Sequence, residues 1–409
     1  MILIRSKGIY DSDSRQLSRN NGLLIENERI SEIGPFQELA RKYSQAGVLD
    51  YPECYLFPGL INTHVHLEFD ATDSVVSNYI EEEPSVRSLR AAKNANKMLL
   101  SGATTVRDAG SSWDLLNLYQ PAVQDIIQLP RLQLAGPPIT ITGGHLYFMG
   151  EEVDTIDESI KSIRLHKKRG CTAIKIIVTG GQMTPGSRIE RTSYTREQIK
   201  AMTHEAHLLG LPTFAHCLTT DGFVDSVCGN VDCIEHAACF VRNKDNGLLE
   251  RVYEPEVMEE FKGKPCYFMK GISASHHIFD HCRNDKSKQT QKEEFLLEQE
   301  QRQYEIFNKY IELGMIPVVG TDAGVTFSYF DETNLELELF VEMCGMSAKD
   351  AIHAGTVSSA ECLNIGHLTG KLAKGMAADI IGLRENPLND IRAFRNVTFV
   401  IANGKLVKE

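Results

Sequence analysis

The sequence predicts an α/β fold, a (β/α)8 TIM-like barrel accompanied by a small β-sandwich. Over the middle of the chain, short apolar runs of strand composition alternate with amphipathic stretches of helical period, as in parallel strands joined by crossover helices. Several of these runs end in a histidine, a lysine or an aspartate, and a barrel gathers the carboxyl ends of all its strands at one face. Both ends of the chain instead contain short strand-like runs separated by turn residues, which predicts the sandwich.

The terminal segments are expected to pair with each other. Strand-like runs occupy residues 2–4, 21–26 and 29–34 near one end, and residues 379–383 and 398–407 near the other. The last run contains Asn403-Gly404, a favoured two-residue hairpin turn. We therefore expect residues 1–55 and 371–409 to form the β-sandwich domain, and residues 56–370 to form the barrel.

Within the barrel region the expected elements are helices over residues 85–101, 193–209 and 289–313, and a strand beginning at residue 103. Residues 241–285 are the least regular segment and mix turn residues with aromatic and histidine residues. Loops at the carboxyl ends of barrel strands carry function, so we expect this segment and residues 325–333 to influence specificity.

The most informative feature is a strand that ends in His64-Val65-His66. Alternate residues of a strand point to one face, so both imidazoles are directed to the same point, as metal ligands require. A solvated strand face explains an isolated His-x-His equally well, and a metal site therefore needs further ligands.

Four more strand-like runs supply such residues. Each of them, taken singly, has an ordinary structural explanation. A histidine there can occupy a core position, an aspartate can cap the N-terminus of a helix, and a lysine can lie on an edge strand. The neighbours of Lys175 are apolar on both sides, however, and an unpaired buried charge is costly. The candidates, each within or at the end of an apolar run, are Lys175, His216, His236 and Asp322.

The ordered strings Pro-Gly-Leu-Ile-Asn-Thr-His-Val-His (58–66), Ile-Lys (174–175), Ala-His (215–216), Glu-His (235–236) and Gly-Thr-Asp-Ala-Gly (320–324) resemble the amidohydrolase superfamily. The resemblance covers essentially the whole chain. It implies two divalent metal ions, which we expect to be zinc. His64, His66 and Asp322 would bind one ion, and His216 and His236 the other. It also implies that CO₂ carboxylates Lys175 to N6-carboxylysine, whose carbamate bridges the two ions.

Two metals that share a water lower its pKa and polarise a carbonyl, so the resemblance implies a hydrolase of amide C–N bonds. Asp322, next to that water, would take its proton as a base and then donate it to the leaving group.

Further strings resemble the prolidase-like branch, which includes Xaa-Pro dipeptidases: Thr105–Gly110, Ile141–His145 and Thr179-Gly180-Gly181. In that branch the second string delivers a histidine to the substrate. His145 is therefore expected to polarise the scissile carbonyl or to bind a carboxylate, as a catalytic and substrate-binding residue. The other candidates for substrate binding are Arg188 and Arg191, as carboxylate clamps, together with Tyr253 and His277.

The chain departs from that branch at two substrate-facing places. Cys239 stands where the branch usually has a tyrosine, and residues 327–330 (Phe-Ser-Tyr-Phe) stand where it often has His-Gly. These changes leave the metal chemistry intact and favour a dipeptidase- or carboxypeptidase-like amidohydrolase whose substrate is bulkier or more apolar.

Two other readings stay open. One is a mononuclear deaminase or imidazolonepropionase-like cyclic amidohydrolase, a neighbouring branch that lacks a lysine at the position of Lys175. The other is a scaffold that has kept the barrel and lost activity, against which the full set of ligands argues.

The composition limits the partners. With 409 residues, a formal net charge of −12 and a pI near 5.6, the chain has none of the basic character of a nucleic-acid binder. It contains no 18-residue apolar run and no signal-peptide pattern, and its ten cysteines are scattered. We expect a cytoplasmic enzyme with a small-molecule amide or peptide substrate and no nucleic-acid or membrane partner. The resemblance also implies a homo-oligomer.

Overall fold

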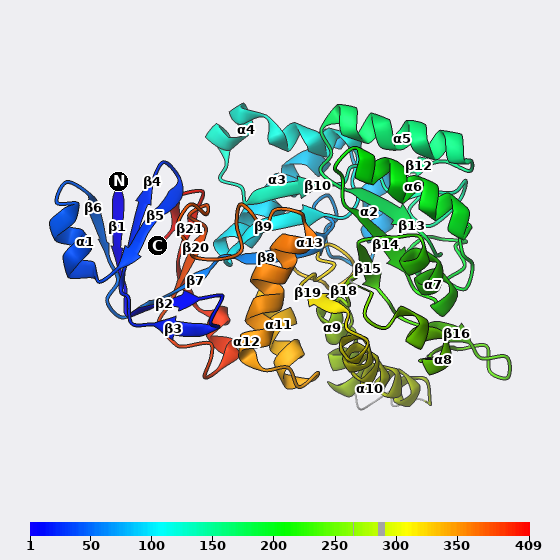
Figure 1. Cartoon of the computed structure of the whole chain (residues 1–409). Helices are drawn as coiled ribbons and strands as arrows, with labels where there is room; N and C mark the ends of the chain where they lie inside the picture. The colour runs from blue at the N-terminus through cyan, green and yellow to red at the C-terminus, as the bar shows by residue number, and fades with distance from the viewer. Residues whose placement is uncertain (265, 285–290) are drawn as a thin grey trace.

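The computed structural model describes residues 1–264, 266–284 and 291–409. Strands from both ends of the chain lie at one side of the molecule, and an α/β body lies at the other (Figure 1). Residues 265 and 285, within the irregular segment 241–285, and residues 289–290, at the start of the helix expected over 289–313, lie outside the described residues.

Two sheets form the β-rich part. The first contains, in spatial order, β5 (Arg29–Gly34), β4 (Gly22–Glu26), β1 (Ile2–Arg5) and β6 (Gly47–Asp50). The second contains β22 (Lys405–Lys408), β21 (Val397–Ala402), β20 (Ile380–Leu383), β7 (Tyr55–Pro58), β2 (Gly8–Asp11) and β3 (Gln16–Ser18). Ile4 and Leu23 of the first sheet share a buried apolar cluster with Ile380 and Phe399 of the second. Strands from the two chain ends therefore build one β-rich unit.

The junction with the α/β body differs from the expectation in one detail. Leu56 and Phe57 belong to β7, which pairs with β20, whereas the strand that carries His64 begins at Leu60 (β8, Leu60–Val65). The sequence shows one continuous apolar run there. Proline lacks an N–H and glycine bends easily, so Pro58-Gly59 separates the run into strands of two different sheets.

The strands of the α/β body are parallel and lie in two sheets. One contains β10 (Arg131–Leu134), β9 (Ala103–Asp108) and β8. The other contains, in order, β12 (Glu151–Glu152), β11 (Ile139–Thr140), β13 (Ile174–Ile177), β14 (Thr213–Cys217), β15 (Cys233–His236), β18 (Tyr267–Met269) and β19 (Ile316–Val318). The Thr63 N–H donates to the Val319 carbonyl at 2.8 Å, and the Asp322 N–H donates to the His64 carbonyl at 2.9 Å. The segment after β19 thus lies against β8; closure of all the strands into one barrel stays a prediction.

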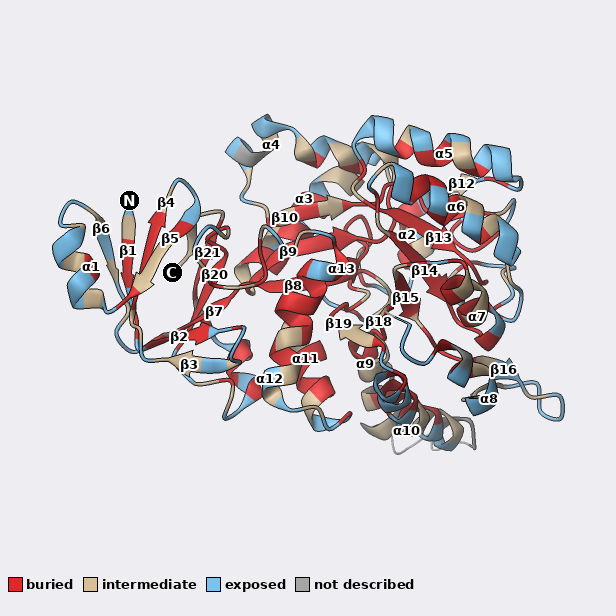
Figure 2. Ribbon diagram, in the orientation of Figure 1, coloured by how far each residue is buried: buried red, intermediate tan, exposed pale blue. Residues whose placement is uncertain are grey.

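Helices cover the outside of these strands, with their buried faces inward and their exposed faces outward (Figure 2). The expected helices over 85–101 and 193–209 correspond to α3 and α6, and Thr195 begins α6 with a capping box to Gln198. The helices are α1 (Phe36–Lys42), α2 (Val75–Glu81), α3 (Pro84–Leu100), α4 (Pro121–Ile126), α5 (Ile156–Arg169), α6 (Arg196–Leu208), α7 (Thr220–Cys228), α8 (Pro255–Met258), α9 (Ile272–Asn284), α10 (Gln291–Glu312), α11 (Thr333–Glu342), α12 (Ala348–His353) and α13 (Ser359–Cys362). Within the described ranges, none of these helices combines the length and the apolar character that crossing a bilayer requires.

The irregular segment folds into a short hairpin and two helices beside the strand ends. Strands β16 (Phe240–Arg242) and β17 (Leu249–Arg251) pair antiparallel, and α8 leads back to β18. Helix α9 then begins two residues after Lys270. The segment therefore lies at the carboxyl ends of β15 and β18.

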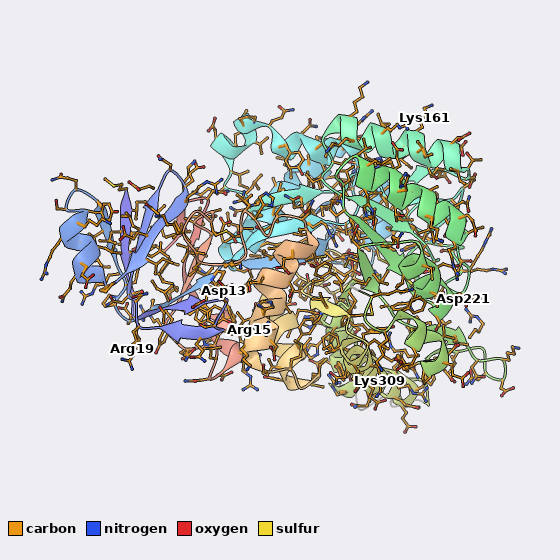
Figure 3. All side chains as sticks on the ribbon, in the orientation of Figure 1. Asp13, Arg15, Arg19, Lys161, Asp221 and Lys309 are labelled. Carbon is orange, nitrogen blue, oxygen red and sulfur yellow. The ribbon has the colours of Figure 1, made fainter. Side chains whose placement is uncertain are left out.

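The β2–β3 hairpin reaches across to the α/β body. Arg15 Nη1 lies 2.5 Å from Asp350 Oδ1 of α12. Beside this contact, Lys371 Nζ, in the segment that leads from the α/β body to β20, lies 3.0 Å from Asp13 Oδ1; Figure 3 labels Asp13 and Arg15. All four side chains are at least partly exposed, so each pair contributes at most about 1 kcal/mol.

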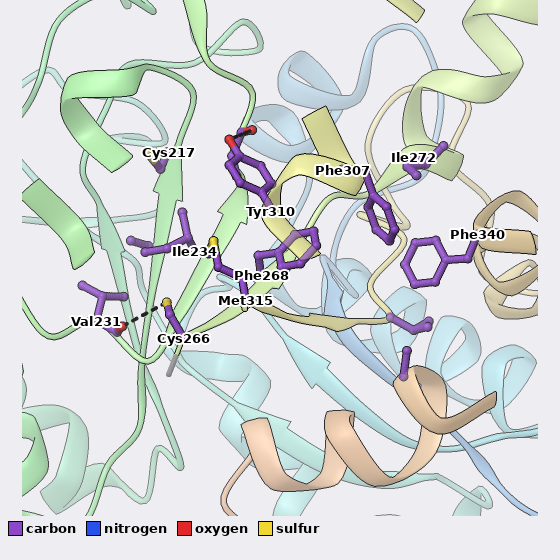
Figure 4. Packing of buried hydrophobic residues seen from close by; sticks show 14 of the residues in the cluster. Cys217, Val231, Ile234, Cys266, Phe268, Ile272, Phe307, Tyr310, Met315 and Phe340 are labelled. Atoms are coloured by element: carbon purple, nitrogen blue, oxygen red, sulfur yellow. Dashed lines mark hydrogen bonds between the residues drawn. The ribbon is translucent and has the colours of Figure 1, made fainter. Parts of the chain in front are cut away.

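Aromatic packing beneath the strand ends fixes α10 and α11. Phe268 of β18 is fully buried, and its ring centroid lies 5.2 Å from that of Phe307 and 5.3 Å from that of Tyr310 (Figure 4). Phe307 in turn lies 4.8 Å from Phe340 of α11. This cluster supports the part of the fold from which one wall of the candidate site is built.

Replacing Phe268 by alanine should leave a cavity in this cluster and lower the free energy of unfolding by about 3 to 5 kcal/mol. Denaturant unfolding checks this value. Leu89→Ala on α3 is the matched control, because Leu89 is 73% exposed and its truncation should change stability by less than about 0.5 kcal/mol. Equal effects of the two substitutions would contradict the packing described here.

Candidate active site

Five imidazoles form a continuous row, four of them at the carboxyl ends of β8, β14 and β15 and the fifth, His145, from the loop after β11. The ring centroid of His64 lies 5.3 Å from that of His66 and 5.1 Å from that of His236. His216 follows at 4.7 Å from His236, and His145 at 4.6 Å from His216. The histidines that the sequence analysis selected as ligands, together with His145, are thus brought together.

Asp322 lies against the start of this row. Its Oδ1 is 3.2 Å from His64 Nε2 and 3.4 Å from His66 Nε2. His66 is oriented through its other nitrogen, since Nδ1 lies 3.0 Å from the Gly110 carbonyl oxygen. The Gly110 carbonyl can accept only from an N–H, so Nδ1 carries the proton and Nε2 presents a lone pair toward Asp322.

Lys175 is 2% exposed within β13, and its ammonium makes an ion pair with Glu235. Glu235 is fully buried and also contacts two other cationic groups: Arg107 Nη2 at 2.9 Å and His64 Nδ1 at 2.9 Å. Arg107 is itself buried, donates from Nε to the Thr63 carbonyl and stacks on Phe214 at 3.7 Å. The interior position of Lys175 excludes the edge-strand explanation, and Glu235 supplies the counterion that a buried lysine requires.

Burial sets the protonation of the row. It lowers the pKa of His66 to about 4, the pKa values of His145 and His236 to about 3, and the pKa of His216 well below its usual range. These four imidazoles are therefore neutral near pH 7, the form in which histidine binds a metal. Burial also acts to lower the pKa of His64, but the Glu235 and Asp322 carboxylates outweigh it and the pKa is raised.

The carboxylates respond in the opposite direction. Burial acts against the charged form of Glu235, yet His64, Lys175 and Arg107 hold its pKa well below the usual range. The same holds for Asp322, whose pKa is lowered by the neighbouring histidines despite its burial. Both side chains are thus ionised, as ligation or base catalysis requires.

The donor set fits divalent metal ions. One ligand atom each from His64, His236 and Asp322 lie within 4.8 Å of one another. Both ring nitrogens of His64 and Oδ1 of Asp322 are buried and make no geometrically sound hydrogen bond, although they approach charged groups. Buried polar atoms are normally satisfied, and a cation between them would satisfy Nε2 and Oδ1.

Unusual backbone conformations position two of these candidate ligands. Asp322 has a φ of +54° and His236 a φ of +64°, values that non-glycine residues adopt at a cost of about 1 to 3 kcal/mol. Gly324, with a φ of +107°, completes the turn after Asp322, and a Cβ there would lie 2.4 Å from the His66 carbonyl oxygen. Residue 324 therefore has to be glycine for His66 and Asp322 to approach each other.

His145 is held by the loop after β13. Its Nδ1 lies 2.8 Å from the Thr184 hydroxyl, which already accepts the Leu146 N–H at 2.9 Å and so keeps its hydrogen for Nδ1. This arrangement places the imidazole proton on Nε2, the nitrogen that can donate to a ligand. Gly181 makes room for the ring, because a Cβ at residue 181 would lie 2.4 Å from His145 Cε1.

Gly181→Ala should displace the His145 ring and lower kcat/KM for amide hydrolysis by about 10- to 100-fold, since a shift of about 1 Å in a substrate-contacting group is that costly. Steady-state kinetics on the best amide substrate measure the change. Gly47→Ala is the control, because its Cβ would meet no atom closer than 4.0 Å. Unchanged kinetics in Gly181→Ala would argue against contact between His145 and the substrate.

A cavity of about 610 Å³ opens over this row. Its lining includes Lys175, all five imidazoles of the row and Asp322. Apolar side chains from the β16–β17 hairpin, α9 and α10 form much of the opposite wall, among them Phe240, Leu249, Phe279, Phe295 and Leu296. The cavity thus combines a polar end with an apolar wall, as ligand sites usually do.

Four other candidates from the sequence are not among the residues that line this cavity. Arg188 and Arg191 are exposed in the loop after β13. Tyr253 packs near Tyr310 at 6.5 Å, and His277 Nε2 lies 2.8 Å from Glu332 Oε2. Their assignment to substrate binding stays a prediction that the cavity lining does not support.

Sequence reasoning missed Glu235, Arg107, Lys270 and Arg251. The first two had a visible signal, because a charged residue within an apolar strand needs a buried partner. Lys270 had the same signal as the candidate metal ligands, since it follows the apolar run of β18 directly. Arg251 ends β17 in the irregular segment, where the sequence offers no periodic pattern.

Comparisons with known proteins agree with this architecture. The family model described as "Amidohydrolase family" matches residues 55–407. The ochratoxinase of Aspergillus niger is 25% identical over 428 aligned residues, covering 95% of this chain and 83% of that protein, and its crystal structure has a TM-score of 0.83. The crystal structure of an Xaa-Pro dipeptidase with methionine bound in its active site is 26% identical, with a TM-score of 0.81 and full coverage of both chains. The imidazolonepropionase of Geobacillus thermodenitrificans is 23% identical over 96% of this chain and 91% of that protein.

Proposed function

The chain belongs to the amidohydrolase family and is an enzyme that hydrolyses amide C–N bonds, and from that premise we propose that it does so with a water held between two divalent metal ions. His64, His66 and Asp322 would hold one ion, His216 and His236 the other, and carboxylated Lys175 would bridge them. Bound there, the ions would lower the pKa of the water and polarise the scissile carbonyl. Zinc suits this set of nitrogen and oxygen donors.

The observation that carries the proposal is the position of Lys175. Its side chain is buried at the centre of the site, lines the cavity and comes from β13, which pairs with the strand of His216. An ammonium would repel two cations, whereas a carbamate on the same nitrogen is an anion with two oxygen donors. The lysine and the histidine pairs therefore suit each other only if Lys175 is carboxylated when the metals are bound.

The remaining residues supply the proton transfers and the orientation of the substrate. Asp322 is ionised and next to both histidines of its pair, so it can accept the proton of the attacking water and later donate it to the departing amine. His145, with its proton on Nε2, can donate a hydrogen bond to the carbonyl oxygen as negative charge develops there.

The substrate we propose is a small amide or peptide in which an amino acid is released. A similar dipeptidase holds methionine in its active site, and another relative is an ochratoxinase. Two branch features of the metal loops are changed here, at Cys239 and at residues 327–330, so we do not extend the proposal to proline dipeptides. The homo-oligomeric state and the cytoplasmic location stay predictions from the sequence.

A single-metal enzyme of the imidazolonepropionase or deaminase type is the alternative, and the imidazolonepropionase relatives keep it open. Lys175 argues against it, because a single-metal site has no use for a bridging ligand.

Metal analysis decides between the two. Protein loaded with zinc in bicarbonate buffer and freed of excess metal should retain close to two ions per chain. A value near one would contradict the two-metal proposal and favour the alternative.

A further inference from the structure

Two cationic side chains line the same cavity beyond the metal ligands, and the proposed chemistry leaves them without a role. Lys270 follows β18 at its carboxyl end and is 5% exposed. Arg251 is the last residue of β17 and is half-buried. The Lys270 ammonium donates to the Ala237 carbonyl at 2.7 Å, and Arg251 Nη1 donates to the Ala238 carbonyl at 3.4 Å. Since these carbonyls are consecutive and directly follow His236, both cations lie beside the metal end of the cavity.

These cations bind only neutral groups within the part of the chain that the structure describes. Besides the carbonyls, Arg251 Nη2 approaches the Gln303 side-chain oxygen at 3.4 Å, and its guanidinium lies over the Phe240 ring at 4.5 Å. Among the described residues that line the cavity, Asp322 is the one carboxylate, and it faces the histidines. Two like charges that face one cavity without a counterion repel each other, so an anion bound from outside would stabilise both.

Unsatisfied donors point to the same place. Arg251 Nε and Gln299 Nε2 are both buried, and neither has a hydrogen-bond partner among the described residues. Both residues line the cavity. The Gln299 side-chain oxygen accepts a hydrogen bond from the backbone N–H of Arg251 at 2.6 Å, which fixes the Gln299 amide beside Arg251. Burial beside Arg251 also lowers the pKa of Lys270 to about 7, a cost that a bound anion would relieve. Two orphaned donors and two cations together offer what a carboxylate accepts.

We infer that Arg251 and Lys270 bind the free carboxylate of the substrate's amine portion, so that the enzyme acts on N-acyl amino acids or dipeptides with an apolar C-terminal residue. The inference rests on the proposed amide hydrolysis at the same site. A carboxylate on these cations would place its α-substituent beside Phe240, Leu249, Phe295 and Leu296, which favours an aromatic or aliphatic side chain. Arg188 and Arg191, the clamps expected from the sequence, are exposed outside the cavity lining.

The test uses two amides that differ only in this carboxylate: N-benzoyl-L-phenylalanine and N-benzoylphenethylamine. The zinc-loaded enzyme should hydrolyse the first with a kcat/KM at least about 100-fold higher, because the second leaves the cations and donors unpaired. Arg251→Met and Lys270→Met should each lower kcat/KM for the carboxylate substrate by about 10- to 100-fold, with little change for the analogue. Arg242→Met is the control, since Arg242 belongs to the same hairpin but pairs on the surface with Glu190. Equal kcat/KM for the two amides in the wild type would overturn the inference while leaving amide hydrolysis intact.

A binding measurement separates this inference from the proposed function. Calorimetric titration with 3-phenylpropionate, and with 3-phenylpropanol as the uncharged control, should show carboxylate-dependent binding that weakens by at least about 10-fold in Arg251→Met and in Lys270→Met. If the protein binds the carboxylate in this way but hydrolyses neither amide, the carboxylate site stands and the proposed hydrolysis fails. If both variants bind 3-phenylpropionate as tightly as the wild type, the carboxylate site is wrong.

Discussion

Lys175→Ala is expected to abolish retention of the two-metal set and to lower kcat/KM by more than about 100-fold, the upper limit for losing an outer-shell partner of a metal site. The reason is that alanine removes the only side chain proposed to touch both ions. The substitution should not unfold the protein, because Glu235 keeps Arg107 and His64 as partners. Metal content after gel filtration and steady-state kinetics measure the two effects.

Two controls separate metal bridging from other effects. Lys175→Met keeps most of the side-chain volume and removes the nitrogen, so it should behave like Lys175→Ala. Lys161→Ala, on the exposed face of α5, should match the wild type (Figure 3). Added acetate should restore part of the metal content of Lys175→Ala, since a free carboxylate can occupy the space that the carbamate leaves. Retention of two ions and wild-type activity in Lys175→Ala would refute the bridge.

The positions of the proposed metal ligands were predictable because they depend on local rules. A strand alternates its side chains, so His64 and His66 had to face the same way once β8 formed. Parallel strands gather their carboxyl ends, so His216, His236 and Asp322 had to meet the first pair. The structure brings all of them together with Lys175.

The partners of these residues were not predictable, because they come from contacts distant in sequence. Arg107 and Glu235 are 128 positions apart and meet only because β9 and β15 both direct a side chain to the interior. Arg251 lies in a hairpin whose sequence follows no clear periodicity. The division of the apolar run 56–65 into β7 and β8 at Pro58-Gly59 was missed for a related reason. Both halves of the run are apolar, and only their pairing partners differ: β7 pairs with β20, and β8 pairs with β9.

Glu235→Gln should lower the free energy of unfolding of the metal-free protein by about 3 to 5 kcal/mol, the range for breaking a buried ion pair. Glutamine preserves the shape of Glu235 but leaves Lys175, Arg107 and His64 with no anion at their centre. Glu338→Gln is the matched control, because Glu338 is equally buried but its partner Arg395 is 56% exposed and can be solvated. Its effect should be much smaller.

The same variant tests the state of Lys175 in the loaded enzyme. If CO₂ converts Lys175 to a carbamate, its ammonium disappears, and Glu235 then has one cation fewer to neutralise. Loading with zinc in bicarbonate should therefore raise the melting temperature of Glu235→Gln more than that of the wild type, where carboxylation has to break the Lys175–Glu235 pair. If the melting temperature of Glu235→Gln lies equally far below that of the wild type before and after loading, Lys175 keeps its ammonium. The bridging carbamate would then have to be abandoned.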